Sequence, residues 1–279
     1  MLFEQNQTFY APAKLNLFLH ITGKRTDGYH NLQTIFQLID YYDEISFSPR
    51  DDQQISALYQ IQNINPDNDL ILKSAILLKN YAQKRNLLDN SQAYGLDIAL
   101  KKLIPMGGGL GGGSSDAATT LLSLNKLWSL DLSKQELISI AAKIGADVPI
   151  FIYGKNAWAE GIGEKLTDIV LPKRWFFVLT PSVHISTKLL FQSDKLNRNC
   201  ELLTIDNYTK SETTNVFEKI VLNEYPEVKC AYDWLSQFAK VRMTGTGACV
   251  FSEFDSEQSC LEIKNKLPEN LKGFYAQSL

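Results

Sequence analysis

The start of the chain has a hydrophobic pattern with a period of two. Apolar residues occupy every second position from Ala13 to Ile21. That period is typical of a strand with one buried face. Lys14 and Asn16 alternate with these positions, so they are predicted to project together from the opposite face of the strand.

Helices and strands are predicted to mix along the rest of the chain. Apolar positions three and four residues apart predict helices over residues 69–85, 116–128, 132–144, 215–222, 227–239 and 256–267. The third begins with Ser133-Lys134-Gln135-Glu136, which has the form of a capping box. Strand-like runs cover residues 94–104, 156–160, 175–180, 241–244 and 249–252, with a last one near Phe274.

This mixture lacks the strict alternation of strand and helix that a doubly wound sheet requires, so the sequence predicts an α+β protein. A length of 279 residues suits two domains. Gly154-Lys155-Asn156 interrupts the chain directly after Tyr153. We therefore expect an N-terminal domain over residues 1–153 and a C-terminal domain over residues 154–279.

Composition excludes several classes of protein. The hydrophobic fraction is 44%, the charged fraction 21% and the net charge −3, which indicates neither disorder nor a surface for nucleic acid. No apolar run approaches the roughly 18 residues of a membrane span. The first residues carry no leader pattern. We expect a cytoplasmic protein that binds neither nucleic acid nor a membrane.

Cysteine and histidine form no metal-binding pattern. The four cysteines are widely spaced and contain no C-x-x-C pair, which favours reduced, buried thiols over a zinc site or disulfides; they are Cys200, Cys230, Cys249 and Cys260. The three histidines contain no H-E-x-x-H motif. A catalytic metal held by these residue types is therefore not expected.

The strongest chemical signal is a glycine-rich segment. Residues 105–118 read P-M-G-G-G-L-G-G-G-S-S-D-A-A and continue into a predicted helix. Glycine loses much conformational entropy on folding, so such a run is favoured where the backbone curls tightly or lies against a ligand. At a helix N-terminus it presents unpaired N–H groups and the positive end of the helix dipole, which predicts a phosphate site. A flexible hinge is the plain alternative, but a hinge does not require Ser-Ser-Asp at the start of the helix.

Two better-known glycine loops fit less well. A P-loop needs lysine after its final glycine, and Gly113 is followed by Ser114. The pattern G-x-G-x-x-G of dinucleotide-binding folds is present, with Asp131 about 20 residues beyond it. Asp131, however, lies in a link between two predicted helices, whereas the ribose-binding acid of that fold belongs at the end of a strand.

An acid and a lysine lie among small or apolar residues. Asp147 follows a predicted helix in Gly145-Ala146-Asp147-Val148-Pro149, and Lys14 lies in Ala11-Pro12-Ala13-Lys14-Leu15. A charge among apolar neighbours is costly unless it is paired or functional. An acid and a cation together suit phosphoryl transfer, in which the acid accepts the hydroxyl proton. A helix-end cap or a salt-bridged core acid is an equal alternative for Asp147.

Two further segments have turn chemistry. Residues 26–31, T-D-G-Y-H-N, place an aromatic ring and an imidazole after a turn, where they suit contact with a planar ring. A surface turn is the plain alternative. Residues 244–249, T-G-T-G-A-C, lie between two predicted strands. They form either a tight hairpin or a second glycine-rich contact near the phosphates.

Taken together, six blocks resemble the GHMP kinase superfamily, which includes galactokinase, homoserine kinase and mevalonate kinase. The family's phosphate loop has the form P-x-x-x-G-L-G-S-S-A-A. The blocks follow the family's order and occupy residues 11–17, 25–30, 107–118, 145–149, 159–164 and 244–251. The A-P-A-K-L-N start and the D-G-Y-H block look like those of one member, whose substrate is a cytidylated methylerythritol.

The resemblance implies a fold and a reaction. The fold has an N-terminal domain like ribosomal protein S5 and a ferredoxin-like C-terminal domain, with the active site in the cleft. The reaction is phosphorylation of the 2-hydroxyl of the methylerythritol moiety by ATP with Mg²⁺, in the non-mevalonate route to isoprenoid precursors. The implied partners are these small molecules, and the chain is expected to be a monomer or a homodimer.

The resemblance also implies roles for individual residues. Asp147 matches the catalytic base, Lys14 its partner, and Asn16 a residue that holds the substrate near the transferred phosphate. The residues implied to bind the ATP phosphates are Pro105, Gly107, Gly108, Gly109, Leu110, Gly111, Gly112, Gly113, Ser114 and Ser115.

Tyr29 and His30 fall on the cytidine site, where one stacks on cytosine and the other reads its edge, and Phe191 covers the opposite ring face. Ser115 is a magnesium ligand only by analogy with relatives. Asp69 stands where relatives usually carry asparagine near the adenine, so no adenine contact is assigned.

Two other functions remain as alternatives. A GHMP kinase of different specificity is disfavoured by Gly28-Tyr29-His30. A non-catalytic nucleotide-binding protein is disfavoured because Lys14 and Asp147 are both present.

Overall fold

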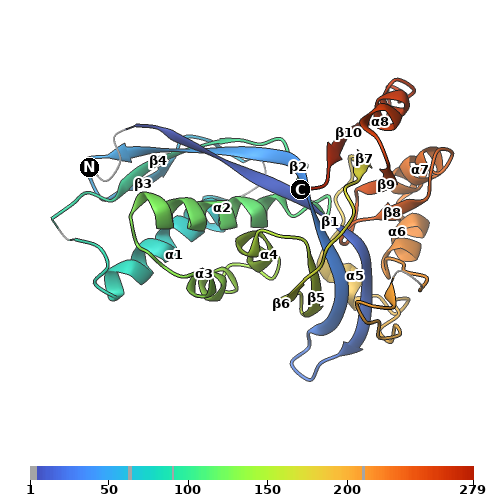
Figure 1. Cartoon of the computed structure of the whole chain (residues 1–279), viewed down its shortest axis with the longest axis horizontal. Coiled ribbons are helices and arrows are strands. Elements are labelled where there is room, and N and C mark those ends of the chain that lie inside the picture. Colours follow the sequence, from blue (N-terminus) through green and yellow to red (C-terminus); the bar gives the residue numbers. More distant parts are fainter. Residues whose placement is uncertain (1–4, 62–64, 90, 209–210) are drawn as a thin grey trace. The chain divides into compact units, whose positions relative to one another are not determined.

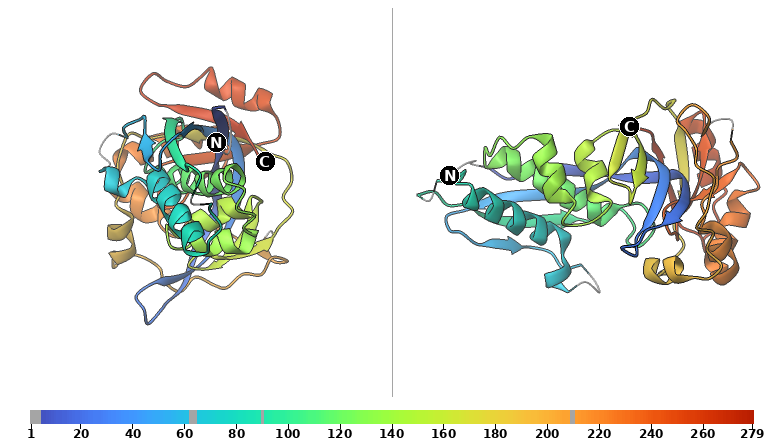
Figure 2. Two further views of the ribbon diagram at one scale, coloured as in Figure 1. Left: turned by 90° about the vertical axis from the view of Figure 1, so that its left-hand side faces the viewer. Right: turned by 90° about the horizontal axis from the view of Figure 1, so that it is seen from below.

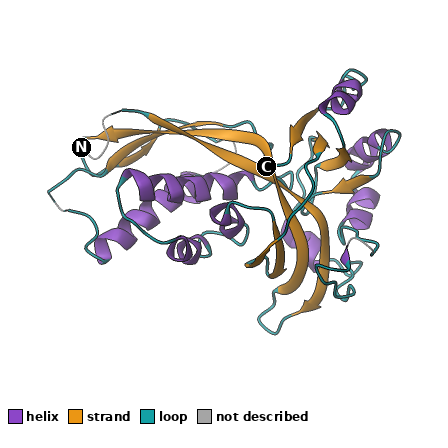
Figure 3. Cartoon of the chain, viewed as in Figure 1, coloured by secondary structure: helices purple, strands orange, loops and turns teal. Residues whose placement is uncertain are grey.

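The computed structural model describes residues 5–61, 65–89, 91–208 and 211–279. Helices and strands are mixed, and the strands form two sheets (Figure 3), which confirms the α+β prediction. The chain divides into two compact units. The first comprises Met1–Pro12, Tyr42–Ile104 and Gly112–Gly154, and the second comprises Ala13–Tyr41, Pro105–Gly111 and Lys155–Leu279.

Both units are discontinuous in sequence because two long strands, β1 (Gln7–Lys24) and β2 (His30–Arg50), run through both of them (Figure 1). One boundary between the units falls at Gly154, beside the predicted domain boundary. The division into family domains over residues 1–153 and 154–279 stays a prediction.

In the part that the structure describes, the first unit combines strands with four α-helices. Strand β4 (Gly95–Lys101) pairs antiparallel with the second half of β2, and β3 (Ile55–Ala57) pairs parallel with β4. The helices are α1 (Leu70–Lys84), α2 (Gly112–Leu127), α3 (Lys134–Ala141) and α4 (Val148–Tyr153), with the short 3₁₀ helix η1 (Pro66–Asn68) before α1. Within this unit the four α-helices lie on one face of the strands (Figures 1 and 2).

The second unit contains the remaining strands of the sheet to which β2 belongs and also a separate antiparallel sheet. Strand β5 (Ala157–Gly161) pairs with the first half of β2, and β6 (Lys165–Asp168) pairs with β5. The antiparallel sheet has the order β10-β7-β9-β8; its strands are β7 (Trp175–Leu179), β8 (Val241–Met243), β9 (Val250–Phe254) and β10 (Gly273–Gln277).

Helices connect the strands of this antiparallel sheet. Those between β7 and β8 are α5 (Thr187–Gln192), α6 (Glu218–Glu224) and α7 (Pro226–Leu235), and α8 (Glu257–Lys264) lies between β9 and β10. Buried residues of the sheet, such as Phe177 and Val250, belong to one core cluster with Val228 and Leu235 of α7. This β-α-β-β-α-β arrangement is ferredoxin-like, as the resemblance implied.

Several local predictions are confirmed. Ser133 caps α3, and both hydrogen bonds of the capping box with Glu136 are present. Helix α1 begins at Leu70 with Asp69 as its N-cap, one residue from the predicted start. These boundaries were predictable because capping depends on residues a few positions apart.

Other predictions differ from the structure. The face of β1 that carries Lys14 and Asn16 is buried as well, so the expectation of one buried face is wrong. Strand β2 was not predicted. Residues 33–39 are buried on both faces and show no alternation, whereas residues 43–48 alternate between buried and half-buried positions. Helix α2 begins at Gly112 instead of residue 116, so glycine does not prevent helix formation in its first turn.

The cysteines are free thiols in differing environments. Cys249 and Cys260 are buried, as expected, whereas Cys200 is half-buried and Cys230 is exposed. Burial raises the pKa of the Cys249 thiol to about 12. Among the described residues, no group of histidine, cysteine, aspartate and glutamate has the arrangement of a metal site. Within the same part of the chain, no helix has the length and apolar composition that a membrane span requires.

Candidate active site

The glycine-rich segment Pro105–Gly111 is held by its carbonyl groups. Cys249 N donates a hydrogen bond to Gly108 O over 3.2 Å, and Lys14 N of β1 donates to Leu110 O over 3.0 Å. Thr244 Oγ1 donates to Gly109 O over 3.1 Å. Three successive carbonyls are therefore bound by protein donors, which fixes the path of the segment.

The backbone N–H groups of this segment differ from its carbonyl groups. None of the N–H groups from Gly107 to Gly111 donates a hydrogen bond to another described residue. Backbone donors that find no protein partner bind water or a ligand. The segment therefore has the property that a phosphate cradle requires, with carbonyl groups held by the protein and amide groups available.

Gly109 shows why the segment needs glycine. Its φ is +77°, and a Cβ atom built there would lie 2.2 Å from Thr244 O. A side chain is excluded both by the backbone conformation and by this contact. The loop between β8 and β9 is thus a hairpin connection that also contacts the glycine-rich segment. Its place near the phosphates stays a prediction.

The first turn of α2 follows the segment in the chain. Its leading N–H groups have no acceptor within the helix. Ser115, in this turn, is fully buried, and its Oγ has no hydrogen-bond partner among the described residues. Leaving a buried polar group unpaired costs about 1–3 kcal/mol. The hydroxyl is therefore available to a ligand.

An ion network in the first unit joins the residues that precede the glycine-rich segment in the chain to those that follow it. Lys102 Nζ donates to Asp43 and, over 2.7 Å, to Asp116 Oδ2 of α2. Asp43 Oδ1 also accepts the N–H groups of Leu103 and Ile104, over 2.5 and 2.8 Å. The network thus joins the residues just before the glycine-rich segment to the first turns of the helix that follows it.

Both carboxylates of this network are buried. Burial raises the pKa of Asp116 to about 7; the cation of Lys102 opposes this shift and the Asp43 carboxylate adds to it. One carboxylate oxygen, Asp116 Oδ1, has no hydrogen-bond partner in the described part of the chain. The start of α2 therefore contains two buried oxygens without partners, on consecutive residues.

Lys14 and Asn16 project together from β1, as predicted. Lys14 Nζ donates to Asn16 Oδ1 over 2.5 Å and lies 5.4 Å from the ring centre of Phe36. Asn16 Nδ2 donates to Thr34 Oγ1 over 2.9 Å. Lys14 is 2% exposed and Asn16 3%. A buried ammonium with an ordered amide beside it has a fixed position, which suits a cation that acts in phosphoryl transfer.

Asp147 lies at the N-cap position of α4 but makes no side-chain capping hydrogen bond there. The interpretation of Asp147 as a helix cap is therefore not supported. Lys14 belongs to the second unit and Asp147 to the first. Their pairing stays a prediction.

The residues implied to bind cytidine gather at the start of β2. Tyr29 lies in the turn before this strand and is 60% exposed. The rings of His30 and Phe191 are 5.2 Å apart with an interplanar angle of 32°. Phe191 also packs edge-on against Phe217, with ring centres 5.0 Å apart. The turn that carries Tyr29 is thus a surface turn, and the packed rings of His30 and Phe191 lie beside it.

His30 has a partner that the sequence did not indicate. Arg198 Nε donates a hydrogen bond to His30 Nε2 over 3.3 Å. Burial first, and then the positive charges of Arg198 and Lys24, lower the pKa of His30 below its usual range. The imidazole is therefore neutral at neutral pH.

Asp69 has a structural role. Its Oδ1 accepts the N–H groups of Ile71 and Leu72 at the start of α1, over 2.8 and 3.2 Å. Its Oδ2 accepts the hydroxyl of Tyr59 over 2.8 Å. Asp69, which departs from the family pattern, thus caps α1 with its carboxylate.

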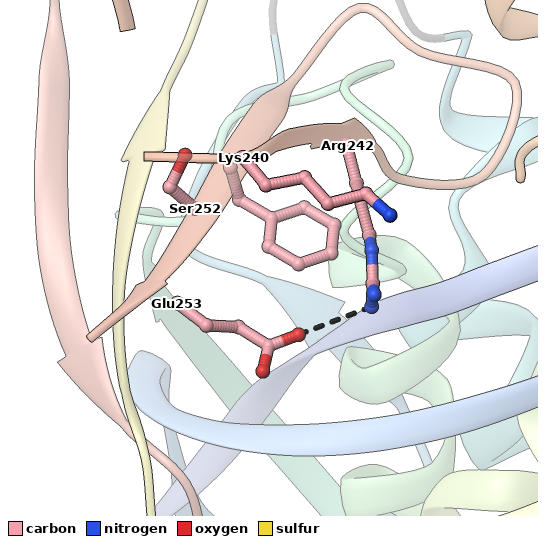
Figure 4. A pocket seen from close by; sticks show the side chains of 5 residues that line it. Lys240, Arg242, Ser252 and Glu253 are labelled. Carbon is pink, nitrogen blue, oxygen red and sulfur yellow. Dashed lines mark hydrogen bonds and ion pairs between the residues drawn. The ribbon is translucent and has the colours of Figure 1, made fainter. Parts of the chain in front are cut away.

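A separate cavity of about 210 Å³ lies beside β8 and β9, lined by Lys240, Arg242, Phe251, Ser252 and Glu253 (Figure 4). Arg242 Nη1 donates to Glu253 Oε1 over 3.1 Å and to Leu17 O over 3.0 Å. None of the predicted site residues lines this cavity. Its central arginine is already paired, so it is not the candidate active site.

Two family profiles match the chain. The profile described as "GHMP kinases N terminal domain" matches residues 57–155, and "GHMP kinases C terminal" matches residues 193–273. The chain belongs to the GHMP kinase family. As a GHMP kinase it is an ATP-dependent phosphotransferase, and the glycine-rich segment lies within the first profile.

Curated GHMP kinases resemble the chain over nearly its full length. The 4-diphosphocytidyl-2-C-methyl-D-erythritol kinase of Burkholderia cenocepacia is 46% identical and covers 96% of this chain and 92% of its own. The kinase of the same name from Shewanella denitrificans is 46% identical, with coverage of 98% and 94%.

Solved GHMP kinase structures share the fold. The crystal structure of a 4-(cytidine 5'-diphospho)-2C-methyl-D-erythritol kinase is 27% identical, covers 98% of this chain and 99% of its own, and has a TM-score of 0.81. The Methanococcus jannaschii mevalonate kinase is 18% identical, covers 99% of each chain and has a TM-score of 0.70. The second likeness shows the fold alone.

Three residues of this GHMP kinase site were missed by sequence reasoning. Asp43 lies in the unpredicted strand β2, Lys102 follows another lysine at a strand end, and Arg198 lies in a segment without periodicity. None of them has a local pattern. Only contacts between residues distant in sequence identify them.

Proposed function

We propose that the chain transfers the γ-phosphoryl group of ATP to the 2-hydroxyl of 4-diphosphocytidyl-2-C-methyl-D-erythritol. The observation that carries the proposal is the glycine-rich segment, whose carbonyls are bound by protein donors while its amides from Gly107 to Gly111 have no described acceptor. Relatives with this substrate in their names match nearly the whole chain. Together these findings support a phosphate-binding enzyme of that specificity.

In the proposed reaction Asp147 accepts the proton of the attacking hydroxyl. A general base of this kind must be within hydrogen-bonding reach of the proton it removes. Lys14 keeps the acid ionised and stabilises negative charge on the attacking oxygen. The ordered Lys14–Asn16 pair supports the role of Lys14.

Mg²⁺ is proposed as the companion of ATP. The residues present fit such an ion, because Ser115 Oγ can serve as an oxygen ligand. It is buried at the start of α2 and has no hydrogen-bond partner among the described residues. When bound, Mg²⁺ would neutralise charge on the phosphates. The amide groups of the glycine-rich segment bind and orient those phosphates in the proposal.

The cytidine end of the substrate is proposed to bind beside His30. Phe191 offers a ring face next to the imidazole, with ring centres 5.2 Å apart. The exposed ring of Tyr29 is available to stack on the base from the other side. A neutral imidazole suits hydrogen bonding to an uncharged base.

The direct test is a substrate panel. The purified protein is incubated with ATP, Mg²⁺ and diphosphocytidyl-methylerythritol, and ADP release is measured. Homoserine and mevalonate serve as controls, because they are substrates of other family members. Turnover with the cytidylated substrate alone is expected, and turnover with a control at a similar kcat/KM would contradict the assignment.

A further inference from the structure

The guanidinium of Arg198 is a hydrogen-bonding centre of the second unit. Besides His30 Nε2, it binds three backbone carbonyls at the end of α5 and just beyond. Nη1 donates to Leu196 O over 3.2 Å, and Nη2 donates to Phe191 O and Ser193 O, each over 2.9 Å. One side chain thus fixes both the segment that carries Phe191 and the imidazole of His30.

This arrangement argues against Arg198 as a ligand of the substrate diphosphate. An arginine that binds phosphate usually presents two parallel N–H groups to it. Here Nε and both Nη atoms already donate to protein acceptors. Arg198 therefore acts through the residues it holds, as a positioning residue.

The bond to His30 determines where the imidazole carries its proton. Arginine is a donor only and stays protonated in proteins. Nε2 of His30 must therefore be the acceptor, which leaves the proton of the neutral ring on Nδ1. Among the described residues, no hydrogen bond to His30 Nδ1 is found, so this N–H is available to a ligand.

The base of the proposed substrate matches this donor. Cytosine presents two acceptors, N3 and O2, beside its amino donor, whereas N3 of uracil carries a hydrogen. A donor facing N3 would bind cytosine and oppose uracil, because two facing donors leave both groups unpaired.

We infer that Arg198 makes the kinase selective for cytidine over uridine by holding His30 as an Nδ1–H donor. The inference deepens the proposed function and rests on it for the identity of the base. The tautomer itself does not depend on the substrate, since it follows from the contact between Arg198 and His30. The two claims can therefore fail separately.

The tautomer is tested by NMR of the wild-type enzyme without ligands. Long-range ¹H–¹⁵N correlation spectra distinguish the protonated from the unprotonated ring nitrogen of each neutral histidine, and a His30→Gln spectrum assigns the signals. The expected result is a His30 with Nδ1 protonated at pH 7.5. A His30 with Nε2 protonated would overturn the inference whatever the enzyme phosphorylates.

Selectivity is tested with the cytidylated substrate and its uridine counterpart. In Arg198→Ala the ratio of the two kcat/KM values is expected to fall about 5-fold, the size of one net hydrogen bond of about 1 kcal/mol. Looser packing of Phe191 would weaken both substrates, so the ratio isolates the hydrogen bond. An unchanged ratio in a folded Arg198→Ala protein would overturn the role in selectivity.

Lys195→Ala is the matched control. This lysine lies in the same segment, but its Nζ pairs with Glu224 over 2.9 Å and is exposed. The control should change neither the His30 spectrum nor the ratio. If Nδ1 of wild-type His30 is protonated but neither nucleotide substrate is phosphorylated, the tautomer stands and the proposed function fails.

Discussion

Around His30, the guanidinium of Arg198 gives its hydrogen bonds to protein acceptors, and the aromatic rings are packed against one another. At the first turn of α2 the opposite holds. Ser115 Oγ and Asp116 Oδ1 are buried there without hydrogen-bond partners in the described part of the chain. Apart from Nδ1 of His30, the first region pairs these polar groups within the protein, whereas the second leaves two buried oxygens unpaired.

The difference follows from what each region is proposed to bind. A neutral base is recognised by shape and by single hydrogen bonds, so a region preorganised by protein contacts loses little on binding. Phosphate and a cation bring strong charges, which can offset the cost of buried polar groups that lack partners in the free protein. Unsatisfied buried atoms are therefore informative about a ligand, and well-satisfied ones are informative about rigidity.

The largest expected effect comes from a residue that belongs to neither region. Asp147→Asn should lower kcat by at least ~10²-fold, the usual size of a general-base contribution, with little change in KM for either substrate. Steady-state kinetics with both substrates varied measures this. Turnover near the wild-type value would remove Asp147 from the chemistry.

A loss of stability is expected when the cation of the ion network is removed. Lys102→Met leaves Asp43 and Asp116 buried together without a positive partner, which should cost about 3–5 kcal/mol of unfolding free energy. Urea denaturation measures the loss. The exposed neighbour Lys101, which pairs with Glu44, provides the control Lys101→Met, which should change stability little. Equal effects of the two substitutions would show that the buried network contributes nothing special.

Two substitutions test whether each region binds a different substrate. Ser115→Ala should raise KM for ATP about 10-fold, from the loss of one ligand hydrogen bond, and leave KM for the acceptor near wild type. His30→Ala should do the reverse and raise KM for the cytidylated acceptor far more than KM for ATP. Both are measured by steady-state kinetics. Similar changes in both KM values in either variant would remove the distinction between the regions.

The smallest expected effect concerns pH. The pKa of His30 is lower in the folded protein than in the unfolded chain. As the pH falls, the unfolded chain therefore protonates its His30 imidazole more readily than the folded protein does. The stability contribution of neutral His30 is therefore complete above the ordinary pKa of about 6.5 and is lost as pH falls through the lowered folded-state value. KM for the acceptor should stay constant from pH 8 to 6.5 and rise below it, and His30→Gln should remove this rise. A rise above pH 7 in the wild type would contradict a neutral His30.

The sequence predicted several local features of the structure. The glycine-rich segment, the start of α1 at Asp69 and the capping box at Ser133 were all identified from residues a few positions apart. Strand β2 was missed, and over residues 33–39 its burial depends on elements that cover both of its faces. Arg198 was missed for a related reason, since its partner His30 lies 168 positions away.

The sequence by itself determined the chemistry that is available, namely a run of glycines before a helix, an acid after a helix, and a lysine and an asparagine on one strand. Backbone conformation and helix capping depend on neighbouring residues, so short stretches of sequence determine them. Only the tertiary structure decided which donors bind the carbonyls of Gly108 to Leu110, which cation lies between Asp43 and Asp116, and which nitrogen of His30 carries its proton. These outcomes depend on distances between residues far apart in the chain, and such distances are set by packing of the whole unit.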